Sequence, residues 1–440
     1  MGRAGGRPDT GRPPDLLVRG TRPLAARPAR GRAAPRRRGP RFPATRRDPV
    51  GEPGARVRPS AVPHPADRLA AGPTRAARRR RPGAGGAAVI DAPPSAPPRH
   101  SIPGTAEPGW TELCDVLEDV LADNGANGGP IELERLKSRV YRLGVGADGR
   151  AHSFVLKRFD PWLARRNELV LRRWLPALGL EERAPRLLAT AAERHGGCVW
   201  HVYEDLGEGA LDPAHPDPER VGVVVALIAE LHTRAAGHAL VPECRHFCGN
   251  LGAPFFAANL ADAIALLERL APPRVEPTPE QGALRGRLLT RLYRLRDDLP
   301  RRVHLLETLG GPDTLLHGDL WTTNTLVHPT PRGLMARLID WDHAAVGPVS
   351  YDLSTFLYRF PKPERPWILE AYRRAVAPAG WHLPPTWLLN VVFETAEYAR
   401  YANRIIWPAV ALLEQRAAWG FEQLAEVERW FDALELALPD

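Results

Sequence analysis

The chain has 440 residues, enough for two or three domains of ordinary size. Its net charge of +9 combines two unlike parts: residues 1–100 hold 23 Arg, no Lys and six acidic residues and carry +17, whereas the rest of the chain carries −8. No apolar run approaches the roughly 20 residues of a membrane helix, and four cysteines are too few for a disulfide framework in a chain of this size, so we expect a cytoplasmic protein without a membrane partner.

Residues 1–105 are rich in Arg, Pro, Gly and Ala and show no sustained apolar period. Such a segment buries too little apolar surface to offset the entropy lost on ordering, so we predict a disordered tail. Its Arg clusters at 36–38 and 78–81 could attract nucleic acid or anionic membranes. The whole chain, however, has 57 Arg and three Lys, which favours a coding bias as the source of the arginines. Nucleic-acid binding through the tail therefore stays the less favoured alternative.

From about residue 108 the pattern becomes that of a folded domain. Apolar residues at helical spacing predict a helix from Trp110 to Leu121, which Asn124 and Gly125 end. Strand-like runs follow at 131–136, 139–143 and 153–159, then a helix over 161–178 and strands at 186–192 and 198–206. The first lobe, residues 106–206, is therefore predicted to be a small antiparallel sheet with one inserted helix.

Residues 207–440 are predicted to form a mainly helical second lobe. A short strand is expected at 334–339, and helical periodicity covers 221–231, 258–270, 284–306, 351–358, 367–376, 387–402 and 410–436. A sheet-rich lobe followed by a larger helical lobe is an α+β, two-lobed arrangement. Cys244 and Cys248 could in principle hold a metal, but a lone Cys-x3-Cys pair without a second ligand pair favours none.

One block of the second lobe carries polar residues suited to chemistry. A polar loop with His317, Asp319 and Asn324 follows an apolar run, and a second apolar strand ends in Asp340 and Asp342. The turn at 329–333 between them would return the chain and bring Asp340 close to Asn324. Phosphoryl transfer needs one carboxylate to orient the attacking hydroxyl and take its proton, and further oxygen ligands to hold Mg²⁺.

His-Gly-Asp-x4-Asn followed by Ile-Asp-Trp-Asp resembles the aminoglycoside phosphotransferase and choline kinase family, which has the protein-kinase-like fold. The likeness spans roughly residues 130 to 410 in its order of elements, although only this block is specific. The resemblance implies Asp319 as the catalytic base, Asn324 and Asp340 as magnesium ligands, and His317 as a brace for the loop. Asp352, in a Tyr-Asp-Leu motif, would steady the backbone of the loop.

The resemblance also implies a nucleotide site in the first lobe. A cation on the third strand should reach the phosphates of ATP, and Lys157 is placed for this, with Glu168 on the following helix as its expected partner. The phosphate turn is expected at 136–139, with Lys137 or Ser138 as contacts, although this turn lacks the glycine of many relatives. Residues 204–207 are expected to be the hinge, where backbone groups bind adenine.

Two other nucleotide motifs are excluded. Residues 144–149 match Gly-x-Gly-x-x-Gly, but a Rossmann loop opens into a helix and this segment opens into a strand, so we expect a turn between the second and third strands. A Walker A loop requires a Gly-Lys dipeptide, and no Lys of the chain follows a Gly.

The sequence indicates little about the acceptor. Glu394, Glu397, Tyr398 and Tyr401 would suit a cationic or sugar-like molecule, and a solvated helix face beside packed aromatic residues is an equally compatible interpretation. We predict a phosphotransferase that uses ATP and Mg²⁺ and moves the γ-phosphoryl group to a hydroxyl of an aminoglycoside-, choline- or sugar-like molecule. The alternative is a catalytically weak, kinase-like protein that binds nucleotide or serves as a scaffold.

Overall fold

The computed structural model describes residues 104–126, 130–147 and 150–439, which fall in a contact unit that runs from Ile90 to the C-terminus. The predicted disordered tail, residues 1–105, lies outside the described residues apart from its last two. Within the described part of the chain, no helix has both the length and the apolar character needed to cross a bilayer. The cytoplasmic location stays a prediction.

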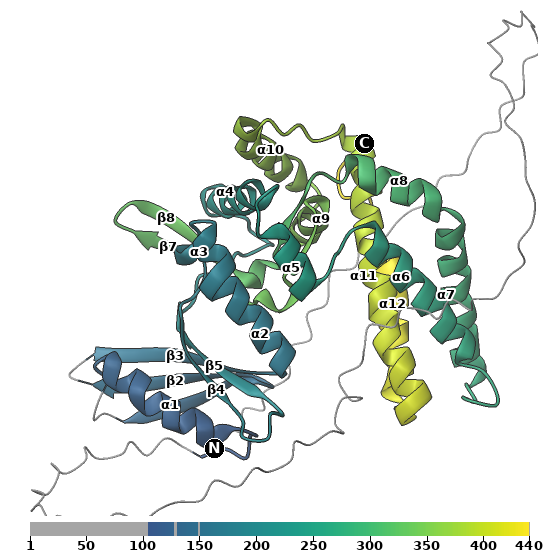
Figure 1. Cartoon of the computed structure of the whole chain (residues 1–440). Helices are drawn as coiled ribbons and strands as arrows, with labels where there is room; N and C mark the ends of the chain where they lie inside the picture. Colours follow the sequence, from purple (N-terminus) through teal and green to yellow (C-terminus); the bar gives the residue numbers. More distant parts are fainter. Residues whose placement is uncertain (1–103, 127–129, 148–149, 440) are drawn as a thin grey trace, which may run out of the picture. The chain divides into compact units, whose positions relative to one another are not determined.

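A five-stranded antiparallel sheet forms the first half of this unit (Figure 1). Its strands lie in the order β1 (Ile131–Lys137), β2 (Val140–Ala147), β3 (Arg150–Phe159), β5 (Val199–Glu204) and β4 (Leu187–Ala192). The predicted first helix is α1 (Trp110–Asp123), and its Trp110 and Leu117 pack against one face of the sheet. Because side chains alternate between the faces of a strand, Leu156 points toward α1 and Lys157 belongs to the opposite face.

The helix predicted over 161–178 packs against this opposite face. It consists of α2 (Pro161–Leu169), a π-helical turn (Val170–Trp174) and α3 (Leu175–Ala177). Phe159, Ala164 and Tyr203 form a small apolar cluster between α2 and the sheet. The predicted antiparallel sheet with one inserted helix is therefore confirmed.

The glycine pattern at 144–149 lies mostly within β2. Gly144 and Gly146 pair with Ser153 and Ala151 of β3, so the strand runs further than expected, and residues 148–149 lie outside the described part. The predicted antiparallel pairing of the second and third strands is confirmed, whereas residues 144–147 of the expected turn belong to β2.

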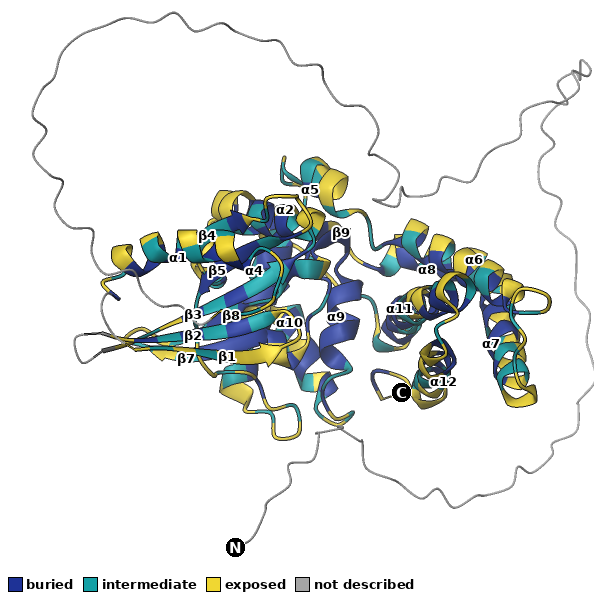
Figure 2. Ribbon diagram, turned by 90° about the horizontal axis from the view of Figure 1, so that it is seen from below, coloured by how far each residue is buried: buried dark blue, intermediate teal, exposed yellow. Residues whose placement is uncertain are grey.

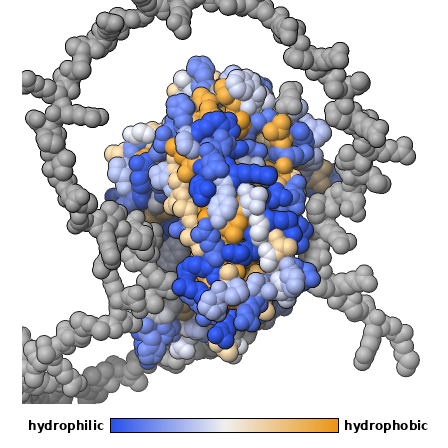
Figure 3. Space-filling model, turned by 90° about the vertical axis from the view of Figure 1, so that its right-hand side faces the viewer, coloured by the Kyte–Doolittle hydropathy of each residue, from blue (hydrophilic) through white to orange (hydrophobic). Residues whose placement is uncertain are grey.

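The rest of the unit is mainly helical and contains two large apolar cores. One core is built around α4, α9 and α10, and the other lies among α6, α7, α11 and α12; α9 is buried along its whole length (Figure 2). On the face that carries α7, hydrophilic side chains surround small apolar patches (Figure 3). The helices are α4 (Pro218–Ala235), α5 (Val241–Cys248), α6 (Ala253–Arg269), α7 (Pro279–Asp297), α8 (Leu299–Leu309), α9 (Ser350–Leu357), α10 (Arg365–Val376), α11 (Thr386–Gln415) and α12 (Trp419–Ala433).

Two short strand pairs interrupt the helices. The hairpin of β7 (Thr325–Thr330) and β8 (Gly333–Leu338) is the one predicted from the turn at 329–333, and β6 (Asp313–Leu316) pairs with β9 (Ala345–Pro348). Together they bring the segments 317–324 and 339–344 side by side. The predicted α+β fold, a small antiparallel sheet followed by a larger helical part, is confirmed, whereas the domain boundary after residue 206 stays a prediction.

Two predicted helix boundaries are wrong. The helix expected over 284–306 is two helices, because α7 ends at Asp297 and Pro300 opens the first turn of α8. Conversely, the break expected between 402 and 410 is absent: α11 continues through Pro408, and the chain turns at Arg416, whose φ is 52°. The helix α5 and the strand β9 were not predicted.

Candidate active site

The loop that follows β6 is held in place by a buried carboxylate. Asp352 of α9 accepts hydrogen bonds from the backbone N–H groups of His317 and Gly318, each at 2.8 Å. The ring of His232 lies 3.3 Å from the same carboxylate. Burial would raise the pKa of Asp352, but His232, His317 and the Gly318 N–H together hold it below its ordinary value. An ionised carboxylate therefore anchors the loop.

His317 and Gly318 shape the loop itself. The His317 ring lies 2.9 Å from the carbonyl oxygen of Ile339 and packs on Trp341 with ring centroids 4.6 Å apart, so it joins the two predicted segments. Gly318 has φ 79°, and a Cβ atom at this position would overlap the carbonyl oxygen of His343. Only glycine satisfies both conditions.

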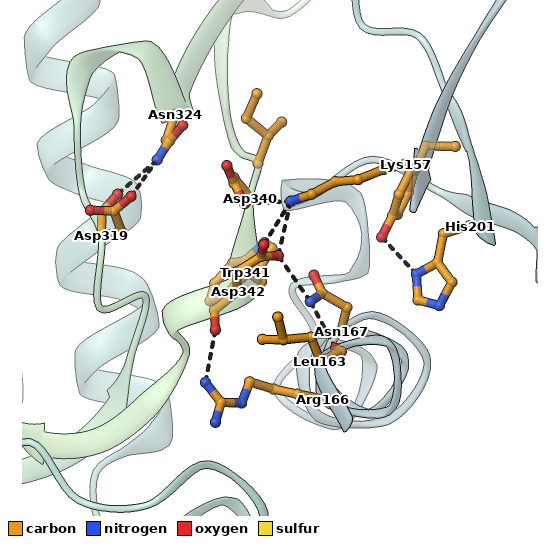
Figure 4. A network of polar contacts seen from close by, with 12 residues as sticks. Lys157, Leu163, Arg166, Asn167, His201, Asp319, Asn324, Asp340, Trp341 and Asp342 are labelled. Atoms are coloured by element: carbon orange, nitrogen blue, oxygen red, sulfur yellow. Dashed lines mark hydrogen bonds and ion pairs between the residues drawn. The ribbon is translucent and has the colours of Figure 1, made fainter. Parts of the chain in front are cut away.

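Asp319 and Asn324 face one another across the loop (Figure 4). The Asn324 amide donates to the backbone oxygen of Asp319 at 3.0 Å and to its carboxylate at 3.2 Å. Asn324 is buried, whereas Asp319 is partly exposed. The arrangement fixes one carboxylate oxygen of Asp319 and leaves the group open to a ligand.

Asp340 follows β8 in a left-handed conformation, with φ 66°. Such a backbone is uncommon for a residue other than glycine and is often found at functional sites. The Ile339 N–H donates to the backbone oxygen of Asn324 at 3.0 Å, which places Asp340 beside the Asp319 loop. The structure therefore brings together His317, Asp319, Asn324, Asp340 and Asp352.

Lys157 of β3 joins this group from the sheet (Figure 4). Its ammonium lies 2.7 Å from Asp340 and 2.9 Å from both oxygens of Asp342. Burial would raise the pKa of Asp340, but the Lys157 charge outweighs that effect and lowers it. Burial and the neighbouring Asp340 raise the pKa of Asp342 despite the same lysine.

The predicted ion pair between Lys157 and Glu168 is not formed. Glu168 contacts Arg165 at 3.3 Å instead. Its neighbour Asn167, which is buried, donates to Asp342 at 3.1 Å, and Arg166 donates to the Asp342 backbone oxygen at 2.7 Å. The sequence signal for Asn167 is its spacing, because Leu163 and Leu171, four residues away on either side, place it on the inner face of the helix.

A cavity of about 230 Å³ opens beside Lys157 and Asp340. Among the predicted nucleotide residues, Lys137 lines it and Ser138 does not, while all four residues of the expected hinge, 204–207, do. Hinge residue Asp205 accepts hydrogen bonds from Ser153 at 2.6 Å and Arg142 at 2.8 Å. The apolar and aromatic part of the cavity wall consists of Leu136, Val140, Val155, Leu171, Pro185, Tyr203, Leu206, Leu326, Ile339 and Trp341.

The predicted acceptor residues on α11 already have partners. Glu394 binds Arg302 at 2.7 Å and accepts a hydrogen bond from Tyr398 at 3.0 Å. Glu397 is 3% exposed and forms an ion pair with Arg400. The aromatic rings of Tyr398 and Tyr401 both pack against Phe431 of α12.

Cys244 and Cys248 lie on α5 as free thiols. Burial raises the pKa of both, so neither is a ready thiolate ligand. Among the described residues, no three His, Cys, Asp or Glu side chains are grouped so that they could hold a metal ion. The expectation that this pair does not bind a metal stays a prediction.

Comparison with known proteins gives a family for most of the described chain. Residues 133–387 match the family model of APH, the phosphotransferase enzyme family. Among curated proteins there is no significant match. The chain is similar to the solved structures of an ethanolamine kinase from Plasmodium vivax (13% identity, TM-score 0.48, covering 73% of this chain and 88% of that one), a macrolide 2'-phosphotransferase from Brachybacterium faecium (20%, 0.45, 71% and 97%) and an aminoglycoside phosphotransferase from Streptomyces rimosus (18%, 0.41, 66% and 98%).

Proposed function

Because this chain belongs to the phosphotransferase enzyme family, we propose that it moves the γ-phosphoryl group of ATP to a hydroxyl group of a small molecule. The observation that carries the proposal is the meeting of side chains from distant parts of the sequence at one cavity. Lys157, Asn324 and Asp340 line the cavity, and Asp319 is hydrogen-bonded to Asn324. Phosphoryl transfer needs such a set, because positioning and charge neutralisation supply most of the catalysis.

Asp319 is the proposed base. Its carboxylate orients the acceptor hydroxyl and takes its proton as the new bond to phosphorus forms. Asn324 holds one carboxylate oxygen, and Gly318 and His317 hold the backbone on which Asp319 is carried. Asp352 acts only through these backbone bonds and is a positioning residue.

The side chains also suit a magnesium ion. Asn324 donates its amide N–H groups to Asp319, and its side-chain oxygen has no hydrogen-bond partner in the described part of the chain. One carboxylate oxygen of Asp340 accepts a hydrogen bond from Lys157, and the other has no hydrogen-bond partner among the described residues. Carboxylate and amide oxygens are the ligands that hard cations prefer, so we assign the ion to Asn324 and Asp340. A bound Mg²⁺ would neutralise charge on the phosphates.

The cavity is the proposed nucleotide site. Its apolar walls suit an adenine ring, the 204–207 segment offers backbone groups beside them, and Lys157 supplies the positive charge for phosphate oxygens. Lys137 is the better placed of the two predicted contacts in the β1–β2 turn, because it lines the cavity. Asn167, rather than Glu168, is the helix residue that supports this end of the site.

The test replaces Asp319 by Asn, with Asp262→Asn on the exposed face of α6 as the matched control. Acceptors would include aminoglycosides, choline-like amines, sugars and amino alcohols, and phosphorylated product would be detected by ³¹P NMR. We expect the Asp319 variant to lose about 10²–10⁴-fold in kcat while it still binds ATP, and the control to match the wild type. Unchanged turnover in a pure Asp319→Asn sample would exclude the mechanism, and ATP binding without turnover of any acceptor would favour a nucleotide-binding scaffold.

A further inference from the structure

An arginine without a carboxylate partner among the described residues lies beside the loop that carries Asp319. Trp321, whose backbone N–H donates to the Asp319 backbone oxygen at 2.8 Å, exposes 44% of its surface. The guanidinium of Arg359, directly after α9, lies 4.1 Å from the centre of the Trp321 ring. A cation on an aromatic face next to the proposed base is therefore open to a bound molecule.

The side chain of Arg359 is partly buried, but no carboxylate pairs with it among the described residues. Within the described part of the chain its guanidinium makes no ion pair, and its Nε atom is buried without a hydrogen-bond partner. Burial lowers the pKa of Arg359, and the nearby carboxylates Glu397 and Asp319 only partly oppose this. An unpaired, partly desolvated cation costs free energy unless a ligand supplies the missing negative charge.

A second cation comes from α11. Glu397, Arg400 and Arg404 succeed one another at spacings of three and four residues and so share one face of the helix. Glu397 forms an ion pair with Arg400, whereas Arg404 is exposed and has no ion-pair partner among the residues that the structure describes. Burial lowers the pKa of His343, Asp319 raises it and Arg404 lowers it, so Asp319 and Arg404 both lie within electrostatic range of this imidazole.

The carboxylates that would receive a cationic acceptor are therefore already neutralised, whereas the guanidinium groups of Arg359 and Arg404 are not. We infer that the acceptor of the proposed transfer is an anionic hydroxyl compound, whose carboxylate or phosphate group binds Arg359 while its hydroxyl faces Asp319, with Arg404 adding positive charge to the surroundings. Arginine is suited to this role because its planar fork matches both anions. The inference rests on the proposed function and deepens it by naming the class of acceptor.

The first experiment compares molecules that share hydroxyl groups and differ in charge. One series is glycerol, glycerate and 3-amino-1,2-propanediol; the other is glucose, glucuronate, glucose 6-phosphate and glucosamine. Binding to the full chain, loaded with Mg²⁺ and a non-hydrolysable ATP analogue, is measured by calorimetry. We expect the anionic members to bind at least about ten-fold more tightly than their neutral and cationic counterparts. Comparing the affinities of glucuronate and glucose 6-phosphate shows whether the site prefers a carboxylate or a phosphate.

The second experiment removes the cations. Arg359→Gln and Arg404→Gln should each lower the affinity for the preferred anion about ten- to hundred-fold and leave binding of the neutral member and the KM for ATP unchanged. Arg404 is exposed, so its variant does not depend on the core of the fold. Arg374→Gln, at an exposed position of α10, is the matched control and should behave as the wild type.

Equal or weaker binding of the anionic members in both series, including no measurable binding by any of them, overturns the inference. So does anion binding that survives both substitutions, or a raised KM for ATP, which would assign the arginines to the nucleotide phosphates. ATP turnover is followed in parallel. Turnover stimulated more by an amine than by an anion contradicts this inference alone, whereas an absence of ATP turnover with every acceptor contradicts the proposed function.

Discussion

At the scale of single residues, replacing Lys157 tests what its positive charge contributes to the site. Its ammonium holds the pKa of Asp340 below the ordinary value, although burial opposes it. In Lys157→Met the side chain keeps its length and loses its charge. We expect kcat/KM for ATP to fall about 100-fold, and the acidic limb of the pH–activity profile to move to higher pH, because Asp340 would protonate more readily.

The measurement is kcat/KM for ATP between pH 4 and pH 8, with Lys362→Met as the control. Lys362 lies before α10 and does not line the cavity. An unshifted acidic limb would show that Asp340 does not need Lys157 to stay ionised.

Asp352 links the site to stability. Its pKa is lowered in the folded state, so it binds fewer protons there than in the unfolded chain. Its contribution is therefore complete above the ordinary aspartate pKa of about 3.9 and is lost as the pH falls through the lower folded value. Asp352→Asn keeps the size of the side chain but offers one acceptor to two backbone donors.

We expect Asp352→Asn to lower the free energy of unfolding by about 3 kcal/mol at pH 7, and the difference from the wild type to shrink below pH 4. Urea unfolding at several pH values measures this, and Asp262→Asn supplies the comparison. A difference that stays constant down to pH 3 would mean that Asp352 is not ionised in the fold.

At the scale of elements, the sequence predicted what is local. The loop at 317–324 and the hairpin leading to Asp340 were predictable because turn, strands and polar residues all fall within some 25 consecutive residues. The contacts of Lys157 were not, because they join β3, α2 and the segment after β8, and the choice between Asn167 and Glu168 depends on how α2 packs. Tertiary packing decides what helical phase alone leaves open.

At both wrong helix boundaries, the structure differs from what the local sequence favours. Proline in a helix interior costs about 3 kcal/mol, which favours a break near Pro408. Yet Ile405, Pro408 and Ala409 are buried, and the apolar core with α6, α7 and α12 carries α11 past this point. Conversely, Leu295 and Leu306 continue the apolar period past Asp298, where the chain nevertheless bends into α8.

The packing of α12 on α11 provides a prediction at this scale. A Cβ atom at Gly420 would lie 2.8 Å from the carbonyl oxygen of Pro408 and closer still to Leu412. We expect Gly420→Ala to lower the free energy of unfolding by about 1–3 kcal/mol through overpacking. Gly286→Ala in α7, where a Cβ meets nothing within 4 Å, should instead raise it by about 0.5–1 kcal/mol. Chemical denaturation of both variants distinguishes steric conflict from helix propensity; a stabilised Gly420→Ala would contradict the packing of these two helices.

At the scale of the whole molecule, the net positive charge comes from a segment outside the residues that the structure describes. Residues 1–100 carry +17, whereas the rest of the chain carries −8 and holds every described contact of the site. The first side chains with described contacts to the sheet come just before α1. Glu107 binds Tyr141 at 2.8 Å and Arg158 at 2.9 Å, and the Pro108 oxygen accepts from the buried Trp200 indole at 2.8 Å.

Two truncations therefore separate the charge of the tail from the stability of the sheet. Removing residues 1–103 keeps Glu107 and Pro108, so we expect the melting temperature and the turnover of ATP to stay those of the full chain. Any affinity for nucleic acid, with the steep salt dependence that arginine–phosphate contacts cause, should disappear in the same variant. The longer truncation, which removes residues 1–108, leaves the Trp200 indole N–H buried without an acceptor. It should lower the free energy of unfolding by about 2 kcal/mol. If the shorter deletion already destabilised the protein to that extent, residues 1–103 would be part of the fold rather than a charged extension of it, because all contacts of 104–108 are still present in that variant.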